Sequence, residues 1–268
     1  MQDHARILEV ARLAAAAGGE VLRHYWHEGV TLRDKTESGG KSYDLVSDAD
    51  VESQEAVAKA ILKAFPDHEL LGEEDLVGDL SAEHLWVIDP LDGTNNFAHH
   101  IPHFAVSIAY FYRGQPVVGV IQNPITGDTY HAVAGQGAWF QGEPIQCMPG
   151  SDLSKALVGC GFYYDRGQMM QQTLKAIEHF FVQNIHGIRR FGTASLDLCH
   201  VARGIFGIFF EYKLSPWDFA AGQLVVQESG GKITQANGEP IGLEPCSVLA
   251  AAAGLYDEAL QITKQYHP

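Results

Sequence analysis

Two aspartates three positions apart, in the sequence LWVIDPLDGTNNFAHH of residues 85–100, have the spacing of a site for a divalent metal ion. The apolar run before them predicts a buried strand, and Pro90 lacks a backbone donor, so we expect the strand to end there. Asp89 and Asp92 then flank a turn, where their carboxylates can converge with the carbonyl oxygen of Leu91. Oxygen ligands of this kind suit Mg²⁺ or Mn²⁺.

The residues that follow are suited to bind an anion. Gly93 permits a close backbone approach, and the amides of Gly93, Thr94 and Asn95 can hold a phosphate group at the start of a short helix. We therefore interpret the stretch as a combined metal and phosphate site. The alternative is that Asp89 and Asp92 are turn and helix-capping residues, which are common positions for aspartate.

Two further acidic stretches favour the metal site over the capping alternative. Residues 70–75, LLGEED, predict a short strand that ends in a glycine and three acids. Residues 215–231, SPWDFAAGQLVVQESGG, place Asp218 at the start of a helix. GEE, WVIDPLDGTNNF and WDFAAGQLVVQESGG, in this order, resemble the inositol monophosphatase family of metal-dependent phosphatases. The motifs are long and specific, and the resemblance spans nearly the whole chain.

The resemblance implies a role for each residue that matches a family motif. Metal binding is implied for Glu73, Asp89, the Leu91 carbonyl, Asp92 and Asp218. Phosphate binding is implied for Gly93 and Thr94. Contact with the substrate is implied for Asp92, Ala194, Glu211 and Asp218. A direct part in catalysis is implied for Glu73, Thr94 and Asp50.

The reaction that the resemblance implies is hydrolysis of a phosphate monoester by metal-activated water. Phosphoryl transfer needs an in-line nucleophile and stabilised charge on the equatorial and leaving oxygens, and two divalent ions can supply both. One metal would activate water beside Glu73 and Thr94, and another, held by the aspartates, would polarise the ester. The resemblance also implies two or three Mg²⁺ ions, with Mn²⁺ as a substitute, and inhibition by Li⁺.

Two interpretations of Asp50 stay open. Within the sequence DLVSDAD, Ser47 and Asp50 have the spacing of a capping box at the start of a helix. In the resembled family, the acid at this place orients the attacking water or a further metal. The loop before it contains Lys35 and Lys41, which can reach the metal or phosphate pocket.

The motifs define the reaction more closely than the substrate. Ala194 in GTAS and Glu211 in EYKLSPWD match positions that contact inositol hydroxyls in inositol monophosphatases, which favours inositol monophosphate. The sequence CGFYYD of residues 160–165 departs from the family pattern, so histidinol phosphate, fructose 1,6-bisphosphate and a 3'-phosphonucleotide stay open. The alternative from another class is a non-catalytic metal-binding interaction protein, which the intact set of acids disfavours.

The charge of the chain bears on its partners. The 268 residues carry a formal net charge of -15, which argues against nucleic acid, because phosphate backbones bind clustered Lys and Arg. An acidic surface also repels a small phosphate monoester, the partner that the motifs favour. Bound divalent ions offset the converging carboxylates, so metal loading makes the pocket attract anions.

Neither a targeting segment nor a membrane span is expected. The start, MQDHARILEVAR, is charged from its third residue, unlike a signal peptide, and no uncharged apolar run approaches the ~18 residues of a membrane span. We therefore expect a cytoplasmic protein with no membrane partner. Four widely separated cysteines without a CxxC pair are expected to be free thiols, namely Cys147, Cys160, Cys199 and Cys246.

Histidines are numerous, 13 in all, and His99, His100 and His103 lie close together in the sequence. A zinc site would place His or Cys at a fixed helical spacing with few hard oxygens nearby. We therefore expect these three to line the helix after the phosphate loop rather than to bind zinc.

The order of elements predicts an α+β protein. An antiparallel meander is predicted within residues 104–141, and residues 156–229 alternate strand and helix as in an α/β unit. Amphipathic helices are predicted for residues 3–26 and 50–65. The second of these helices places on one apolar face Val51, Ala58, Leu62 and Phe65.

The change of pattern near Pro149 divides the chain into two lobes of one compact unit. The N-terminal lobe, residues 1–149, contains the metal and phosphate motifs, and the C-terminal lobe, residues 150–268, is the α/β part. The family resemblance implies a layered α-β-α-β-α sandwich and a homodimer.

Overall fold

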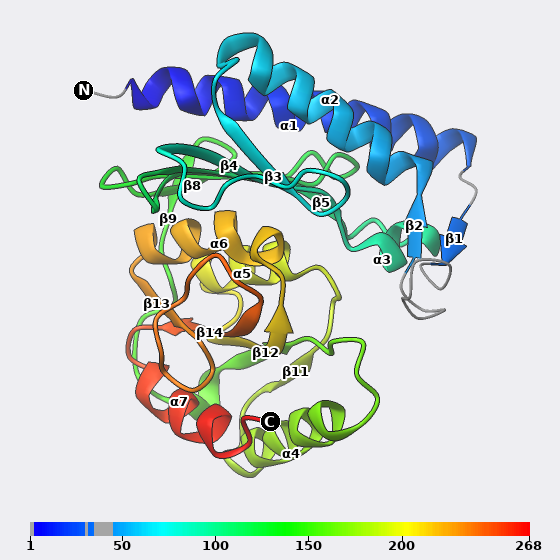
Figure 1. Ribbon diagram of the computed structural model, residues 1–268. Coiled ribbons are helices and arrows are strands. Elements are labelled where there is room, and N and C mark those ends of the chain that lie inside the picture. Colours follow the sequence, from blue (N-terminus) through cyan, green and yellow to red (C-terminus); the bar gives the residue numbers. More distant parts are fainter. Residues whose placement is uncertain (1–2, 30–31, 35–44) are drawn as a thin grey trace.

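The computed structural model describes residues 3–29, 32–34 and 45–268, with the side chains of residues 3–29 and 48–268. Its elements stack in the order helix, sheet, helix, sheet, helix, from top to bottom in Figure 1. The predicted α+β sandwich is therefore confirmed. The loop with Lys35 and Lys41 lies outside the described residues, and the strands that flank it, β1 (Leu32–Asp34) and β2 (Leu45–Ser47), pair antiparallel.

The outer layer next to the larger sheet consists of α1 (His4–Glu28) and α2 (Asp48–Ala64). Asp3 caps α1, because its carboxylate accepts a hydrogen bond from the Arg6 amide at 3.1 Å. The two helices approach closely at Gly18, where an added Cβ would lie 2.8 Å from Ser53 Oγ. This close packing fixes the position of α2, whose inner face lies against β4.

The larger sheet has, in the described part of the chain, seven strands in the order β3-β4-β5-β6-β7-β8-β9. β3 is parallel to β4, and each later pair is antiparallel. The predicted meander is thus confirmed, and β9 extends it. The strands are β3 (Glu69–Gly72), β4 (His84–Asp92), β5 (Ala105–Tyr112), β6 (Gln115–Gln122), β7 (Thr129–Val133), β8 (Ala138–Phe140) and β9 (Glu143–Ile145).

One strand runs further than we predicted. The strand before Asp89 was expected to end at Pro90, but β4 continues to Asp92. The register with β5 shifts between the two aspartates, so Pro90 and Leu91 form a bulge in which proline donates no ladder hydrogen bond. On the other edge of β4, the pairing with β3 ends at Ile88, so Pro90 lies beyond the residues that hydrogen-bond to β3.

Helices α5 (Ala194–Ala202) and α6 (Pro216–Glu228) lie between the two sheets. Both are buried on almost every side, which explains why their apolar residues follow no single stripe. One apolar cluster includes Val87 of the larger sheet, Phe219 of α6 and Phe209 of the smaller sheet. The core therefore runs through both halves of the sequence.

The smaller sheet has, among the described residues, five strands in the order β11-β10-β12-β14-β13. β10 is parallel to both of its neighbours, as expected of an α/β part, and β14 is antiparallel to β12 and β13. Helices α4 (Gln168–Val182) and α7 (Tyr256–Gln265) cover its outer face. The strands are β10 (Leu157–Cys160), β11 (Gly187–Arg189), β12 (Ile208–Leu214), β13 (Gly231–Thr234) and β14 (Cys246–Ala252).

None of the described helices combines the length and the apolar character that a membrane crossing requires. The cysteines are free thiols, as expected, and two of them, Cys160 and Cys199, are buried.

Candidate active site

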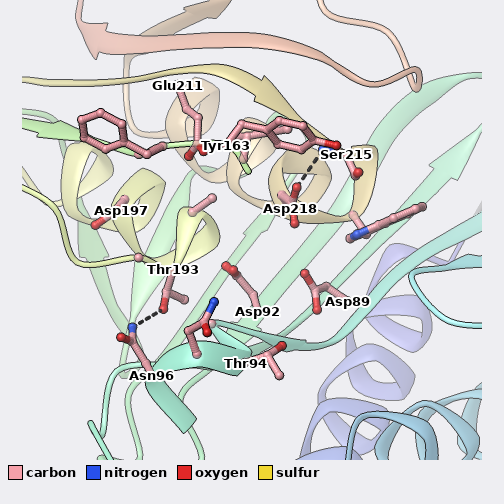
Figure 2. A pocket seen from close by; sticks show the side chains of 18 of the residues that line it. Asp89, Asp92, Thr94, Asn96, Tyr163, Thr193, Asp197, Glu211, Ser215 and Asp218 are labelled. Carbon is pink, nitrogen blue, oxygen red and sulfur yellow. Dashed lines mark hydrogen bonds between the residues drawn. The ribbon is translucent and has the colours of Figure 1, made fainter. Parts of the chain in front are cut away.

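A cavity of about 280 Å³ lies where the end of β4, the short helix α3 (Thr94–Ala98) and the start of α6 meet. Its wall also includes Glu211 and Leu214 of β12 in the smaller sheet, so both sheets and the middle helix layer contribute to it. Figure 2 shows the cavity from close by. Nine of the predicted site residues line it, namely Glu73, Asp89, Leu91, Asp92, Gly93, Thr94, Ala194, Glu211 and Asp218. Asp50 does not line the cavity, but its carboxylate accepts a hydrogen bond from the hydroxyl of Thr94, which does.

Three carboxylates meet in this cavity. Asp89, Asp92 and Asp218 each offer one oxygen, and these oxygens lie within 4.8 Å of one another (Figure 2). The bulge in β4 explains why the first two share a face. Asp89 pairs with Ser107 and Asp92 with Ala105, so the extra residue reverses the alternation that would otherwise separate them. Asp218 joins them from the first turn of α6.

A backbone amide anchors one oxygen of each carboxylate. The three hydrogen bonds are Leu91 N–H to Asp89 Oδ1 at 3.0 Å, Ser195 N–H to Asp92 Oδ2 at 2.7 Å, and Ser215 N–H to Asp218 Oδ2 at 2.7 Å. The last is half of a capping box at the start of α6. Asp89 Oδ2, by contrast, is buried without a hydrogen-bond partner among the described residues.

Because the three carboxylates are buried close together, their ionised forms destabilise the fold unless a cation is bound. Burial raises the pKa of Asp92 to about 7. Burial, and then repulsion by neighbouring carboxylates, raises the pKa of Asp89 and of Asp218 well above the usual range. Carboxylate and carbonyl oxygens are the ligands of hard divalent cations, and Asp89, a member of the cluster, has one buried oxygen without a hydrogen-bond partner among the described residues. The residues present therefore fit a metal of the Mg²⁺ type.

The inner face of α2 holds the acidic segments in place. Gln54 Oε1 accepts the amide of Glu74 at 3.2 Å, and Ser53 Oγ donates to the proline carbonyl in the β4 bulge at 3.0 Å. The apolar face that we predicted for this helix is confirmed for Ala58 and Phe65, which pack against the core, and wrong for Val51 and Leu62, which are 36% and 38% exposed. The inner face also turns two polar side chains, Ser53 and Gln54, toward the site that they support.

The hydroxyl of Thr94 lies between two acceptors. Its oxygen is 3.2 Å from Asp50 Oδ1 and 3.1 Å from the carbonyl oxygen of Leu91. Asp50 is only 1% exposed, so it reaches the cavity through Thr94. The capping-box interpretation of Asp50 involves the side chain of Ser47, which lies outside the described residues.

Gly93 makes room for a link between the two halves of the chain. Its φ of 96° is left-handed, and an added Cβ would strike Thr193 Oγ1. Thr193 Oγ1 donates to the carbonyl oxygen of His103 at 2.7 Å and accepts from Asn96 Nδ2 at 3.2 Å, the latter bond dashed in Figure 2. These bonds hold the segment before α5 against α3.

Glu211 and Ala194 occupy the wall formed by the second half of the chain. Burial raises the pKa of Glu211 to about 8, although the charge of Arg190 acts in the opposite direction. The side chains of this wall that sequence reasoning missed include Phe162, Tyr163, Tyr164 and Arg190. The unusual CGFYYD segment and the adjacent Arg189 and Arg190 were visible signals, but neither indicates by itself which cavity it faces.

The three neighbouring histidines do not stay together. His99 ends α3 and His100 follows it, as expected. His103 was expected beside them, but its ring instead lies parallel to that of His200 in α5, with 5.7 Å between the ring centroids and 6° between the planes. The chain turns between them, where the His103 amide donates to the carbonyl of Ile101 at 2.7 Å.

Known proteins share this architecture. A model of the inositol monophosphatase family matches residues 3–267. The fructose-1,6-bisphosphatase/inositol-1-monophosphatase of Aquifex aeolicus is 36% identical over 266 residues, which cover 99% of this chain and 98% of that protein. The Nus factor SuhB of Pseudomonas aeruginosa is 37% identical over 266 residues, which cover 97% and 96%. The solved inositol monophosphatase of Anabaena has a TM-score of 0.86 and 35% identity, covering 98% of this chain and 97% of that one.

The family match includes every segment that builds the cavity, from β3 to the start of α6. The solved relative extends the agreement to both sheets and all the helix layers. With a carboxylate cluster suited to metal at the centre of that shared fold, this chain belongs to the inositol monophosphatase family and is a metal-dependent phosphatase.

Proposed function

We propose that this phosphatase hydrolyses inositol monophosphate to inositol and phosphate with Mg²⁺ as its cofactor. The observation that carries the proposal is the convergence of Asp89, Asp92 and Asp218 within 4.8 Å in a cavity whose other wall holds Glu211. When bound, Mg²⁺ supplies positive charge that acidifies water and neutralises the phosphoryl oxygens. The proposed ligands are Glu73, Asp89, the Leu91 carbonyl, Asp92 and Asp218.

Thr94 orients the attacking water and relays one of its protons. The Thr94 hydroxyl donates to Asp50 Oδ1, so its oxygen can accept a hydrogen bond from a water beside Glu73. The Glu73 carboxylate accepts the second hydrogen and fixes the direction of attack. As the water oxygen bonds to phosphorus and the ester P–O bond breaks, one proton passes through Thr94 to Asp50. The released inositol oxygen takes a proton from solvent.

The two walls of the cavity divide the substrate between them. Gly93 and Thr94 hold the phosphate, beside the carboxylate cluster. Ala194 and Glu211, together with Asp92 and Asp218, contact the polyol. Glu211 has a pKa of about 8 without metal, and divalent cations bound in the same cavity favour its ionised form. Losing a hydrogen bond from a hydroxyl group to such a carboxylate typically costs ~1.5 to 3 kcal/mol.

Fructose 1,6-bisphosphate is the second candidate substrate. The name of the Aquifex aeolicus relative includes fructose-1,6-bisphosphatase, and that relative matches almost the whole chain. Arg190 lines the same cavity and offers a cation for a second phosphate group. Histidinol phosphate and a 3'-phosphonucleotide belong in the same substrate comparison.

A binding role from another class is suggested by the Nus factor SuhB of Pseudomonas aeruginosa. The charge cluster argues against a catalytically idle version of this fold, because Asp89, Asp92 and Asp218 are expensive to bury together unless a cation is used. Turnover of any phosphate monoester that depends on these residues excludes the idle version.

The family resemblance extends the proposal to a homodimer and to inhibition by Li⁺. Sedimentation equilibrium of the full chain tests the first, with a mass near twice 29.3 kDa expected. Titration of Li⁺ against Mg²⁺-dependent turnover tests the second.

A phosphate-release panel tests the substrate. The full chain with Mg²⁺ is assayed on inositol 1-phosphate, fructose 1,6-bisphosphate, histidinol phosphate, a 3'-phosphonucleotide and an aryl phosphate. Highest kcat/KM on inositol 1-phosphate supports the proposal. A preference for the bisphosphate that is lost in Arg190→Gln favours the second candidate, and no release from any ester overturns the catalytic assignment.

A further inference from the structure

A second cluster of ligand atoms lies outside the proposed Mg²⁺ site. His103, Asp197 and His200 each offer one ligand atom, and these atoms lie within 4.8 Å of one another. Each residue also has one buried polar atom without a hydrogen-bond partner among the described residues, namely His103 Nε2, Asp197 Oδ1 and His200 Nδ1. His103 comes just before β5, while Asp197 and His200 are three residues apart in α5 and so project from one face of that helix. The proposed mechanism uses none of these three residues.

The three atoms are buried and unsatisfied. Each makes no hydrogen bond to any described residue, and Asp197 is only 1% exposed. The distance between Asp197 Oδ1 and His200 Nδ1 is 3.9 Å, which is too long for a hydrogen bond. Buried polar atoms are normally paired, so three such atoms in one cluster of residues indicate something that the protein chain itself does not supply.

We propose that His103, Asp197 and His200 bind one transition-metal ion, Zn²⁺ or a close chemical equivalent, separately from Mg²⁺. Two imidazole nitrogens and one carboxylate oxygen form a donor set that suits Zn²⁺, whereas Mg²⁺ prefers oxygen alone. Three protein ligands leave one position of a tetrahedral ion for water. In such a site the ligand atoms lie ~3.4 Å apart, so the cluster has to contract only slightly.

The histidines are prepared for this role. Burial lowers the pKa of both His103 and His200 to about 4, so both rings are neutral and have a free lone pair at neutral pH. The two rings are parallel, and Phe191 packs against each of them at 5.1 and 5.6 Å between centroids. The backbone of His103 is fixed as well, since its carbonyl accepts from Asn96 Nδ2 at 2.8 Å.

The position of the cluster gives the ion an entry path and a structural consequence. Asp197 also lines the active-site cavity, on the side away from Asp89 in Figure 2. Two residues earlier in α5, Ser195 donates its amide to Asp92. An ion bound here would link the segment before β5 to α5. It would thereby stabilise the position of α5, the helix whose Ser195 amide orients the proposed Mg²⁺ ligand Asp92.

Metal retention in the presence of competing Mg²⁺ tests this inference. The full chain is loaded with Zn²⁺, dialysed against a large excess of Mg²⁺, and analysed by mass spectrometry for metal content. Wild type should retain one Zn²⁺ per chain, and both His103→Gln and His200→Gln should retain none. His99→Gln is the matched control, because it removes an exposed histidine of the same segment, and it should retain Zn²⁺.

Two further readouts separate binding from folding and from the proposed Mg²⁺ site. At Zn²⁺ about 100-fold above its Kd, the melting temperature of wild type should rise by roughly 5 °C, with no rise in His200→Gln. Asp92→Asn should keep the Zn²⁺, because it leaves this cluster intact. Complete loss of Zn²⁺ from wild type during dialysis, or equal retention by His200→Gln with native circular dichroism, would mean that the three atoms hold only a buried water.

Discussion

The amide of Ser195 donates a 2.7 Å hydrogen bond to Asp92 Oδ2 across 103 positions of sequence. It joins the end of β4 in the larger sheet to the first turn of α5 in the middle layer. The same carboxylate offers one oxygen to the cluster with Asp89 and Asp218. The orientation of a central carboxylate therefore depends on how the second half of the chain packs against the first.

Replacing Asp92 by asparagine tests its proposed role as a metal ligand. Asp92→Asn keeps the size of the side chain and removes its charge, so Mg²⁺-dependent kcat should fall by several orders of magnitude while the fold persists. Steady-state phosphate release and circular dichroism measure the two effects. Asp79→Asn, at an exposed turn aspartate whose carboxylate accepts from Ser81, is the control and should be fully active. Near-normal turnover by Asp92→Asn would reduce Asp92 to a turn residue.

Removing the metal should abolish activity reversibly. The buried carboxylates repel one another, so the folded protein gains free energy when a divalent cation binds between them. Treatment with a chelator should stop phosphate release and lower the melting temperature, and added Mg²⁺ should restore both. Ca²⁺ should substitute poorly, because it prefers longer bonds and looser geometry. Undiminished turnover in chelator would refute the metal mechanism.

Glu211→Gln should separate substrate recognition from chemistry. Glu211 is 8% exposed and lies on the wall opposite the metal cluster, so its loss should lower kcat/KM on inositol monophosphate by about tenfold to a hundredfold. An aryl phosphate has no hydroxyls for Glu211 to hold, and its turnover should be nearly unchanged. The ratio of the two losses is the decisive quantity. Equal losses on both esters would place Glu211 in the catalytic machinery instead.

Glu211 should also make the metal-free protein less stable at high pH. Its pKa is about 8 in the folded state, mainly because of burial, against ~4.3 for an exposed glutamate. Folding therefore favours the protonated form, whose contribution is complete at low pH and is lost as the pH rises from ~4 to ~8. Between the ends of this window, wild type should lose on the order of 4 kcal/mol of unfolding free energy more than Glu211→Gln. Urea unfolding in chelator measures the difference, and parallel pH profiles would contradict it.

The two proposed lobes should not fold separately. Val87 before the boundary and Phe209 and Phe219 after it share one apolar cluster, so cutting at residue 149 exposes a large apolar surface. Residues 150–268 expressed alone should show no sharp thermal transition and little near-ultraviolet circular dichroism. A cooperative transition of this fragment would show that the C-terminal lobe is an independent domain.

Several elements have strong local signals and could be predicted from the residues alone. The apolar run before Asp89, the glycine after Asp92 and the proline-started helix with Asp218 each act within a few residues. The order of the elements predicted an α+β protein, whereas the layered sandwich and the nine cavity residues were implied by the resemblance of the motifs to the inositol monophosphatase family. The positions of individual strands and helices depend on backbone preference and short-range spacing, which a single segment already contains.

The contacts that each segment makes depend on the tertiary structure and could not be predicted from the segment alone. The strand β4 continues through Pro90, because a bulge accommodates the proline and the pairing with β3 has already ended at Ile88. The inner face of α2 carries Ser53 and Gln54 beside the buried Val57 and Ile61, because the site that the two polar side chains support comes from other parts of the chain. His103 meets His200 across 97 positions of sequence for the same reason. Such contacts form only when whole layers pack together. The apolar surface buried between the layers then determines which residues face inward, even where the local pattern of one element predicts otherwise.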